Sequence, residues 1–289
     1  MRAFSTPMIQ LYTGAAEPSD EFPVVEPIAQ PLGEVDQVEW LACRETWRPF
    51  PSRNPTSRQE PFTLPWFEEV EKRRYARHGK WIPKYFEFKR HRGDKVLGLG
   101  DGLGTDWVNY ARHGATVFHC ASTLDSQDAV RRNFELRGLM GNFQRGQLAA
   151  LPYAADSMDV VCLSTLGGTI PALAEVVEEA FRVLKPGGKL LAALPAKYSA
   201  QFWSGVWLPW RRMFSDAPED RSSYSVRRVK RLLGRFAEVN WHKRHLRRSD
   251  VPHLWRWMLL PVMERLMGRF LVIKTFKPVA ARGALRMAA

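Results

Sequence analysis

KVLGLGDGLGTDWVNYARHG, from Lys95 to Gly114, is the stretch that decides the fold. An apolar strand of about Lys95–Leu99 runs into a loop with glycine at every second position. A helix of about Asp106–His113 follows, with Thr105 as its N-cap and Gly114 as its stop. Glycine lets bare backbone approach a small ligand, and loop amides beside a helix N-terminus favour an anionic group. The stretch therefore predicts a ligand site at the end of this strand.

Strands and helices alternate downstream of the loop. We expect strands at about Thr116–Cys120, Asn142–Gln144, Met158–Leu163 and Lys189–Leu194, and helices at about Gln127–Arg137 and from Leu173 onward. In the second of these helices, apolar residues recur at i, i+3, i+4, i+7 and i+8, which is typical of a helix with one buried face. The alternation favours an α/β fold with a doubly wound, mostly parallel sheet.

The two ends of the chain differ from this middle part. Residues 1–63 are a proline-rich N-terminal extension, and residues 64–289 form the main domain, with an aromatic and basic cap insert at about 200–233. The pattern then predicts, in chain order, a basic helix capped by Ser225, a strand, an apolar helix and a last strand, at about Val226–Leu233, Phe236–His242, His253–Leu266 and Arg269–Phe276.

Charge and cysteine content narrow the function classes. The net charge of +13 lies entirely on residues 201–289, which suits either an anionic partner surface, such as a peripheral membrane, or a solvated basic face. Nucleic acid is disfavoured because no recognition motif accompanies the charge. The three cysteines form no CxxC pair, no metal-ligand cluster occurs, and the N-terminus lacks the apolar stretch of a signal peptide. A cytoplasmic protein without a metal site is expected.

Two common nucleotide-binding motifs do not fit the glycine loop. A GxGxxG fingerprint would need glycine where the chain has Leu103 or Thr105, and no GK[ST] follows as in a P-loop. The GxGxG spacing, together with LPYAADSMDVV (151–161) and RVLKPGGKLL (182–191), resembles the class I S-adenosylmethionine-dependent methyltransferases. The likeness is to the methyltransferase type 11 branch, in which a helix ending in tyrosine, here Tyr75, precedes the loop. It implies a Rossmann-like, seven-stranded sheet with an antiparallel C-terminal hairpin.

The resemblance also implies a cofactor site for S-adenosylmethionine at the carboxyl ends of the first strands. By that likeness the loop borders the methionine part, the end of the second strand faces the ribose, and the next loop borders the adenine. The residues after the fourth strand line the methyl-transfer side. The residues assigned in this way are Tyr75, Gly98, Gly100, Asp101, Gly102, Gly104, Thr105, Ala121, Ser122, Gln147, Leu148, Ser164 and Thr165.

Three positions depart from the family pattern. The acidic residues expected on the first strand, after the second strand and before the adenine-side loop are replaced by Gly98, Ala121 and Gln147. A hydrogen bond to a charged group contributes roughly 1.5–3 kcal/mol, so these losses bear directly on cofactor affinity. Partial replacement could come from the amide of Gln147, the hydroxyl of Ser122 or the carboxylate of Asp125.

No catalytic residue stands out, and a structural role is favoured for His119 inside the second strand. Many methyltransferases work chiefly by bringing an activated methyl close to a nucleophile, so a general base is optional. The leading hypothesis is methyl transfer from S-adenosylmethionine to a small, lipid-like or saccharide acceptor. The alternative is a catalytically degenerate protein of the same fold that serves as a binding or scaffold protein. It could associate with an anionic membrane or nucleic acid through its basic C-terminal third.

Overall fold

The computed structural model describes residues 59–76, 79–164, 172–199, 202–203, 223–246 and 260–279. All of them belong to one compact unit, residues 42–289. Most of the N-terminal extension, most of the cap insert and the predicted site residue Thr165 lie outside the described residues, as does the first part of the apolar helix expected near His253.

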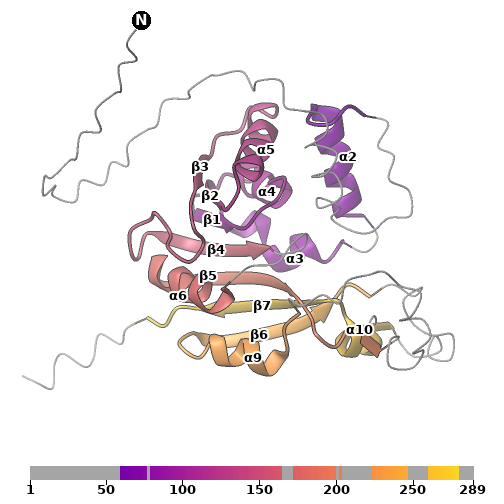
Figure 1. Cartoon of the computed structure of the whole chain (residues 1–289), viewed down its shortest axis with the longest axis vertical. Helices are drawn as coiled ribbons and strands as arrows, with labels where there is room; N and C mark the ends of the chain where they lie inside the picture. The colour runs from indigo at the N-terminus through magenta and orange to yellow at the C-terminus, as the bar shows by residue number, and fades with distance from the viewer. Residues whose placement is uncertain are drawn as a thin grey trace, which may run out of the picture. The chain divides into compact units, whose positions relative to one another are not determined.

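A seven-stranded sheet forms the centre of the described structure (Figure 1). Its spatial order is β3-β2-β1-β4-β5-β7-β6. The five strands on one side are parallel, and β7 is antiparallel to both β5 and β6. The expected mostly parallel sheet with an antiparallel C-terminal pair is confirmed. The strands are β1 (Lys95–Leu99), β2 (Thr116–Ala121), β3 (Asn142–Arg145), β4 (Met158–Ser164), β5 (Leu184–Pro195), β6 (Ala237–Arg244) and β7 (Phe270–Phe276).

Helices pack along the parallel strands of the sheet and along its antiparallel C-terminal pair. In Figure 1, α4 and α5 lie beside β1–β3, and α9 lies beside β6. The N-terminal helix α2 contacts α4, and α10 contacts β6. The helices are α2 (Leu64–Arg74), α3 (Ile82–Phe86), η1 (Phe88–Arg90), α4 (Thr105–Arg112), α5 (Leu124–Glu135), α6 (Leu173–Val183), α9 (Val226–Leu232) and α10 (Leu260–Met267). None of the described helices is long and apolar enough to cross a membrane.

The apolar period in the sequence correctly predicted the buried face of α6. Leu173, Val176, Val177 and Ala180 are all buried, in the same core cluster as apolar residues of β4 and β5. The helix ends at Val183, and the KPGG segment that follows lies within β5, where the register with β4 shifts. The glycines and proline thus break the helix as expected, but they do so inside a strand.

Two helix starts differ from the prediction. Helix α4 begins at Thr105, and its N-cap is Gly104, whose φ of +70° lies in the left-handed region that favours glycine. The assignment of Thr105 as N-cap was therefore wrong. Helix α5 begins one turn earlier than expected, because the side chain of Thr123 accepts a hydrogen bond from the Ser126 amide.

Candidate functional site

The glycine loop after β1 opens at Gly100. The φ of Gly100 is +111°, and among the described residues a Cβ placed there would meet only the Ser164 carbonyl oxygen, at 3.6 Å. The loop is fixed from beneath, because the Gly100 amide donates to the Cys120 carbonyl at 3.3 Å. Gly100 is thus a point where backbone can approach a ligand between the ends of β1 and β4.

Two other loop glycines are needed for packing. A Cβ on Gly98 would lie 2.6 Å from Cδ2 and Cε2 of Trp107, and one on Gly104 would lie 2.7 Å from Cγ1 of Val130. Both neighbours are buried. Gly98 and Gly104 therefore let helices α4 and α5 pack closely, and the Trp107 ring fills the space that an acidic side chain on β1 would need.

Helix α5 holds the middle of the loop. The Ser126 hydroxyl accepts a hydrogen bond from the Gly102 amide at 2.9 Å and lies 3.2 Å from the Gly102 carbonyl oxygen. The Asn133 side-chain amide donates to the Leu103 carbonyl at 2.7 Å. The amides of Gly100 and Gly102 thus both donate within the protein itself, so a ligand would meet a loop whose shape is already set.

His119 supports the loop from the core. Its ring is fully buried, and Nε2 lies 3.1 Å from the Gly100 carbonyl oxygen, so that nitrogen carries the proton. Burial lowers the pKa of His119 to about 4, although the Gly100 carbonyl acts in the opposite direction. A neutral, buried imidazole that braces a turn fits the structural role expected from the sequence.

A buried ion pair lies beside the glycine loop, next to the end of β4. Arg74, at the end of α2, binds Asp106 in α4 through two hydrogen bonds, one of them from Nε to Oδ1 at 2.7 Å. Burial acts to lower the pKa of Arg74, but the Asp106 carboxylate outweighs this effect and raises it. Ser164, at the end of β4, joins both groups, since its Oγ lies 3.2 Å from an Arg74 nitrogen and 3.1 Å from an Asp106 oxygen.

Tyr75 extends this network without facing open space. Its hydroxyl donates to Asp106 Oδ1 at 2.9 Å and accepts from the Asn109 side-chain amide at 3.0 Å. Burial, together with the Asp106 carboxylate, raises the pKa of Tyr75 well above its ordinary value. The hydroxyl therefore stays protonated and positions α2 against α4.

The ribose side of the predicted site holds a carboxylate from an unexpected position. Ala121, where the acid was expected, is fully buried. The exposed Asp101, on the glycine loop, accepts hydrogen bonds from the backbone amides of Ser122 and Thr123 at 3.0 and 3.2 Å. The Ser122 hydroxyl also donates to Asp101, so its acceptor lone pairs are the part that could serve a ribose hydroxyl, the role expected from the sequence.

The two residues predicted to border the adenine differ in exposure. Gln147 is exposed, whereas Leu148 is buried in the main core cluster with Leu151 and Tyr153. Leu148 thus forms part of the wall rather than presenting a polar group. The side chain of Asp125 lies outside the described part of the chain.

Sequence reasoning missed the groups that hold this site together. Arg74 and Trp107 carry no motif, since each acts through a residue distant in the chain. For Ser126 the local signal was Thr123, a residue type preferred at helix N-caps, and it indicates a helix start rather than the contact with Gly102. Asp101 lies in the glycine loop that the sequence predicted. Its hydrogen-bond partners at the end of β2 follow only from the pairing of β1 with β2.

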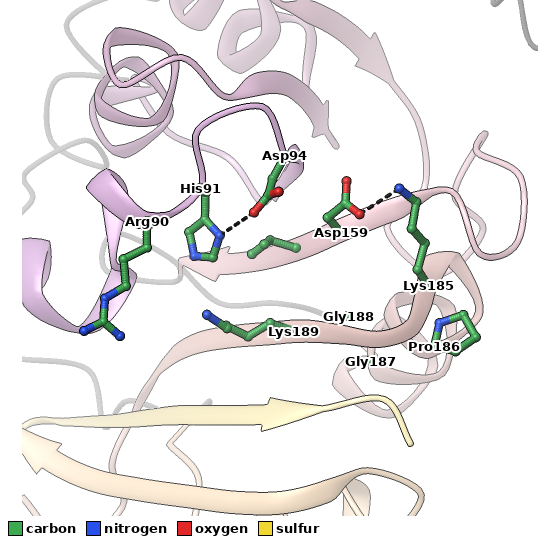
Figure 2. A pocket seen from close by; sticks show the side chains of 10 residues that line it. Arg90, His91, Asp94, Asp159, Lys185, Pro186, Gly187, Gly188 and Lys189 are labelled. Atoms are coloured by element: carbon green, nitrogen blue, oxygen red, sulfur yellow. Dashed lines mark hydrogen bonds and ion pairs between the residues drawn. The ribbon is translucent and has the colours of Figure 1, made fainter. Parts of the chain in front are cut away.

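A separate hollow lies at the other edge of the sheet. It has a volume of about 510 Å³ and lies at the amino ends of β1 and β4, next to the KPGG segment (Figure 2). Polar side chains in its lining are paired with each other, since His91 Nδ1 lies 2.9 Å from an Asp94 oxygen and Lys185 Nζ lies 2.7 Å from an Asp159 oxygen. None of the predicted site residues lines it. Ligands of open α/β sheets bind at the carboxyl ends of the strands, so this hollow does not correspond to the predicted ligand site.

Comparison with known proteins agrees with the fold and its glycine loop. Residues 96–192 match the family model of a methyltransferase domain. The chain is 32% identical over 124 residues to a demethylmenaquinone methyltransferase of Beutenbergia cavernae, which covers 42% of this chain and 46% of the relative. It is 26% identical over 122 residues to the corresponding enzyme of Streptomyces avermitilis, covering 42% of this chain and 48% of that one. The matched region spans just under half the length of these curated relatives.

The similarity to solved structures covers more of the chain than the similarity to these relatives. A SAM-dependent methyltransferase from Aquifex aeolicus superposes with a TM-score of 0.51 at 13% identity, covering 74% of this chain and 98% of that chain. A SAM-dependent methyltransferase from Methanosarcina mazei gives 0.50 at 16% identity, covering 68% and 98%. At these identities the likeness shows the fold.

Proposed function

We propose that the chain methylates a small acceptor with S-adenosylmethionine, because residues 96–192 match the family model of a methyltransferase domain. The open backbone at Gly100 carries the proposal, because it lies at the carboxyl edge of the sheet between the ends of β1 and β4. A carboxylate at Asp101 lies at the end of β2 on one side of it, and the Arg74 cation lies beside Ser164 on the other.

These groups suit the charges of the cofactor. Asp101 would face the nucleoside, and the guanidinium of Arg74 would favour the carboxylate of the methionine part. The bound cofactor supplies a methyl group on a positively charged sulfur. A nucleophilic electron pair of the acceptor would take this methyl group, the carbon–sulfur electron pair would stay on sulfur, and the proton displaced from the acceptor would leave to water.

The chain's own residues act by positioning. His119 is neutral and faces the Gly100 carbonyl from the core, and the pKa of Tyr75 is raised well above its ordinary value by burial, so neither suits a general base towards the acceptor. The residues that brace the loop, Ser126 and Asn133, would hold its shape when the cofactor binds.

A lipid-like acceptor is the class that the relatives favour, with a saccharide as the second class. Two of the similar proteins are demethylmenaquinone methyltransferases, whose acceptor by name is an apolar quinone. The purified chain, given methyl-labelled S-adenosylmethionine and reduced demethylmenaquinone, should place label in the organic phase. A soluble glycoside serves as the saccharide arm. Binding of the cofactor without label in either arm would refute these acceptor classes.

Association with an anionic surface is a second proposal, and it rests on α9. This helix exposes four basic side chains and has no acid in its first turn: Arg227, Arg228, Lys230 and Arg231. Binding to vesicles that contain anionic lipid should fall steeply between low and high salt. Equal binding to neutral and anionic vesicles would rule this surface out.

We place the activity in the cytoplasm, which the two buried, free cysteines Cys120 and Cys162 support.

A further inference from the structure

The exposed carboxylate at the end of β2 comes from the glycine loop. Asp101 Oδ1 accepts hydrogen bonds from the Ser122 amide at 3.0 Å, the Thr123 amide at 3.2 Å and the Thr123 hydroxyl at 3.2 Å. Its Oδ2 accepts from the Ser122 hydroxyl. A side chain from the end of one strand therefore covers the backbone at the end of its neighbour, 21 residues further along the chain.

This arrangement leaves acceptor capacity for a ligand. An ionised carboxylate offers about four lone-pair positions on its two oxygens. Oδ1 is fully used, whereas Oδ2 accepts one hydrogen bond within the described part of the chain. Because Asp101 is exposed, that second oxygen can still receive hydroxyl donors from outside.

The carboxylate is also held still. Thr123 caps α5 and donates to Asp101 at the same time, and Ser126 ties the next loop residue, Gly102, to that helix. A preorganised acceptor loses little freedom when a ligand arrives, so each hydrogen bond contributes more to affinity.

We infer that Asp101 binds the ribose hydroxyls of the adenosyl ligand and so takes over the task for which Ala121 has no polar group. In open α/β sheets with a glycine loop after the first strand, a carboxylate at the end of the second strand accepts hydrogen bonds from the ribose. Here the carboxylate reaches that place from the other strand. This inference rests on the proposed use of S-adenosylmethionine.

The test compares ligands with and without the ribose hydroxyls. Calorimetric titration of the full chain uses S-adenosylhomocysteine, adenosine and 2′,3′-dideoxyadenosine. The wild-type protein should prefer adenosine to the dideoxy compound by roughly 10- to 100-fold, the range for a charge-assisted hydrogen bond. In Asp101→Asn this preference should shrink several-fold, and the affinity for S-adenosylhomocysteine should fall about 10-fold.

Two further variants separate ribose binding from a purely structural role. Glu135→Gln removes the same charge at the far end of α5 and should leave all three affinities unchanged. Asp101→Ser combined with Ala121→Asp returns a carboxylate to β2 and should restore the adenosine preference. Ala121→Asp alone should weaken binding, because two neighbouring carboxylates repel.

The outcomes are distinct. If the wild type binds S-adenosylhomocysteine but Asp101→Asn keeps the adenosine preference, Asp101 does not bind the ribose and the proposed function stands. The same conclusion follows if the variant loses both nucleosides equally, or if the folded double variant recovers no preference. If the wild type binds none of the three ligands, both the inference and the proposed function are overturned.

Discussion

Replacement of Gly98 by alanine tests whether Trp107 has taken the place of the first-strand acid. The added Cβ would lie 2.6 Å from two ring atoms of Trp107 and 3.0 Å from a third. The ring is 4% exposed and stacks against Tyr110 with centroids 6.5 Å apart, so it has little room to retreat. Overpacking of this kind costs about 1–3 kcal/mol, and we expect Gly98→Ala to lower the free energy of unfolding by about 2 kcal/mol.

Urea denaturation measures this change, and Gly146→Ala is the matched control. A Cβ on Gly146 would make ordinary contacts, at 3.4 Å from Cys120 Sγ and 3.6 Å from Pro152, so that variant should be close to neutral. Trp107→Leu in the Gly98→Ala background should cost less than the two single changes together, with a coupling of about 1–2 kcal/mol. Equal stability of Gly98→Ala and Gly146→Ala would refute the reasoning, and the absence of the acid would then need another cause.

Three further predictions concern the groups around the loop. Arg74→Met leaves the Asp106 carboxylate buried without its cationic partner and should lower the free energy of unfolding by about 3–5 kcal/mol. The double variant Arg74→Met with Asp106→Leu should recover part of this loss. An equal loss in the single and the double variant would contradict the ion pair. Ser126→Ala removes the acceptor of the Gly102 amide and should cost about 1–3 kcal/mol in the same assay, and an unchanged midpoint would mean that the hydroxyl does not hold the loop. The folded protein keeps His119 neutral down to about pH 4, whereas the unfolded chain binds a proton near pH 6.5. The free energy of unfolding should therefore fall by up to about 3 kcal/mol as the pH drops from 6.5 to 4. His119→Gln should make the free energy of unfolding less dependent on pH in this range, and parallel pH profiles for the two proteins would refute the prediction.

The fold could be predicted because it depends on local patterns. The strand, glycine loop and helix at Lys95–Gly114, and the apolar period from Leu173, are encoded within short windows, and the sheet order follows from their alternation. Boundaries were less certain where a single cap decides them. Helix α5 starts at Leu124 because Thr123 caps it, and no apolar period announces that turn.

The site could be predicted only in part, because its decisive contacts join distant residues. Arg74 and Asp106 are 32 positions apart, and Asp101 and Ser122 are 21 apart. Each of these pairs forms only when strands and helices are placed next to one another. The three missing carboxylates were visible in the sequence, but the sequence could not show that Trp107 fills one place and that Asp101 brings a carboxylate to another.

Titration of the full chain with S-adenosylmethionine, followed by calorimetry, addresses the central claim most directly. We expect one saturable site, which S-adenosylhomocysteine occupies in competition and which weakens when Gly100 is replaced by valine. That residue's φ of +111° does not suit a branched side chain. The absence of heat at high micromolar ligand, or binding that the Gly100 variant leaves intact, would contradict an adenosyl site at the glycine loop.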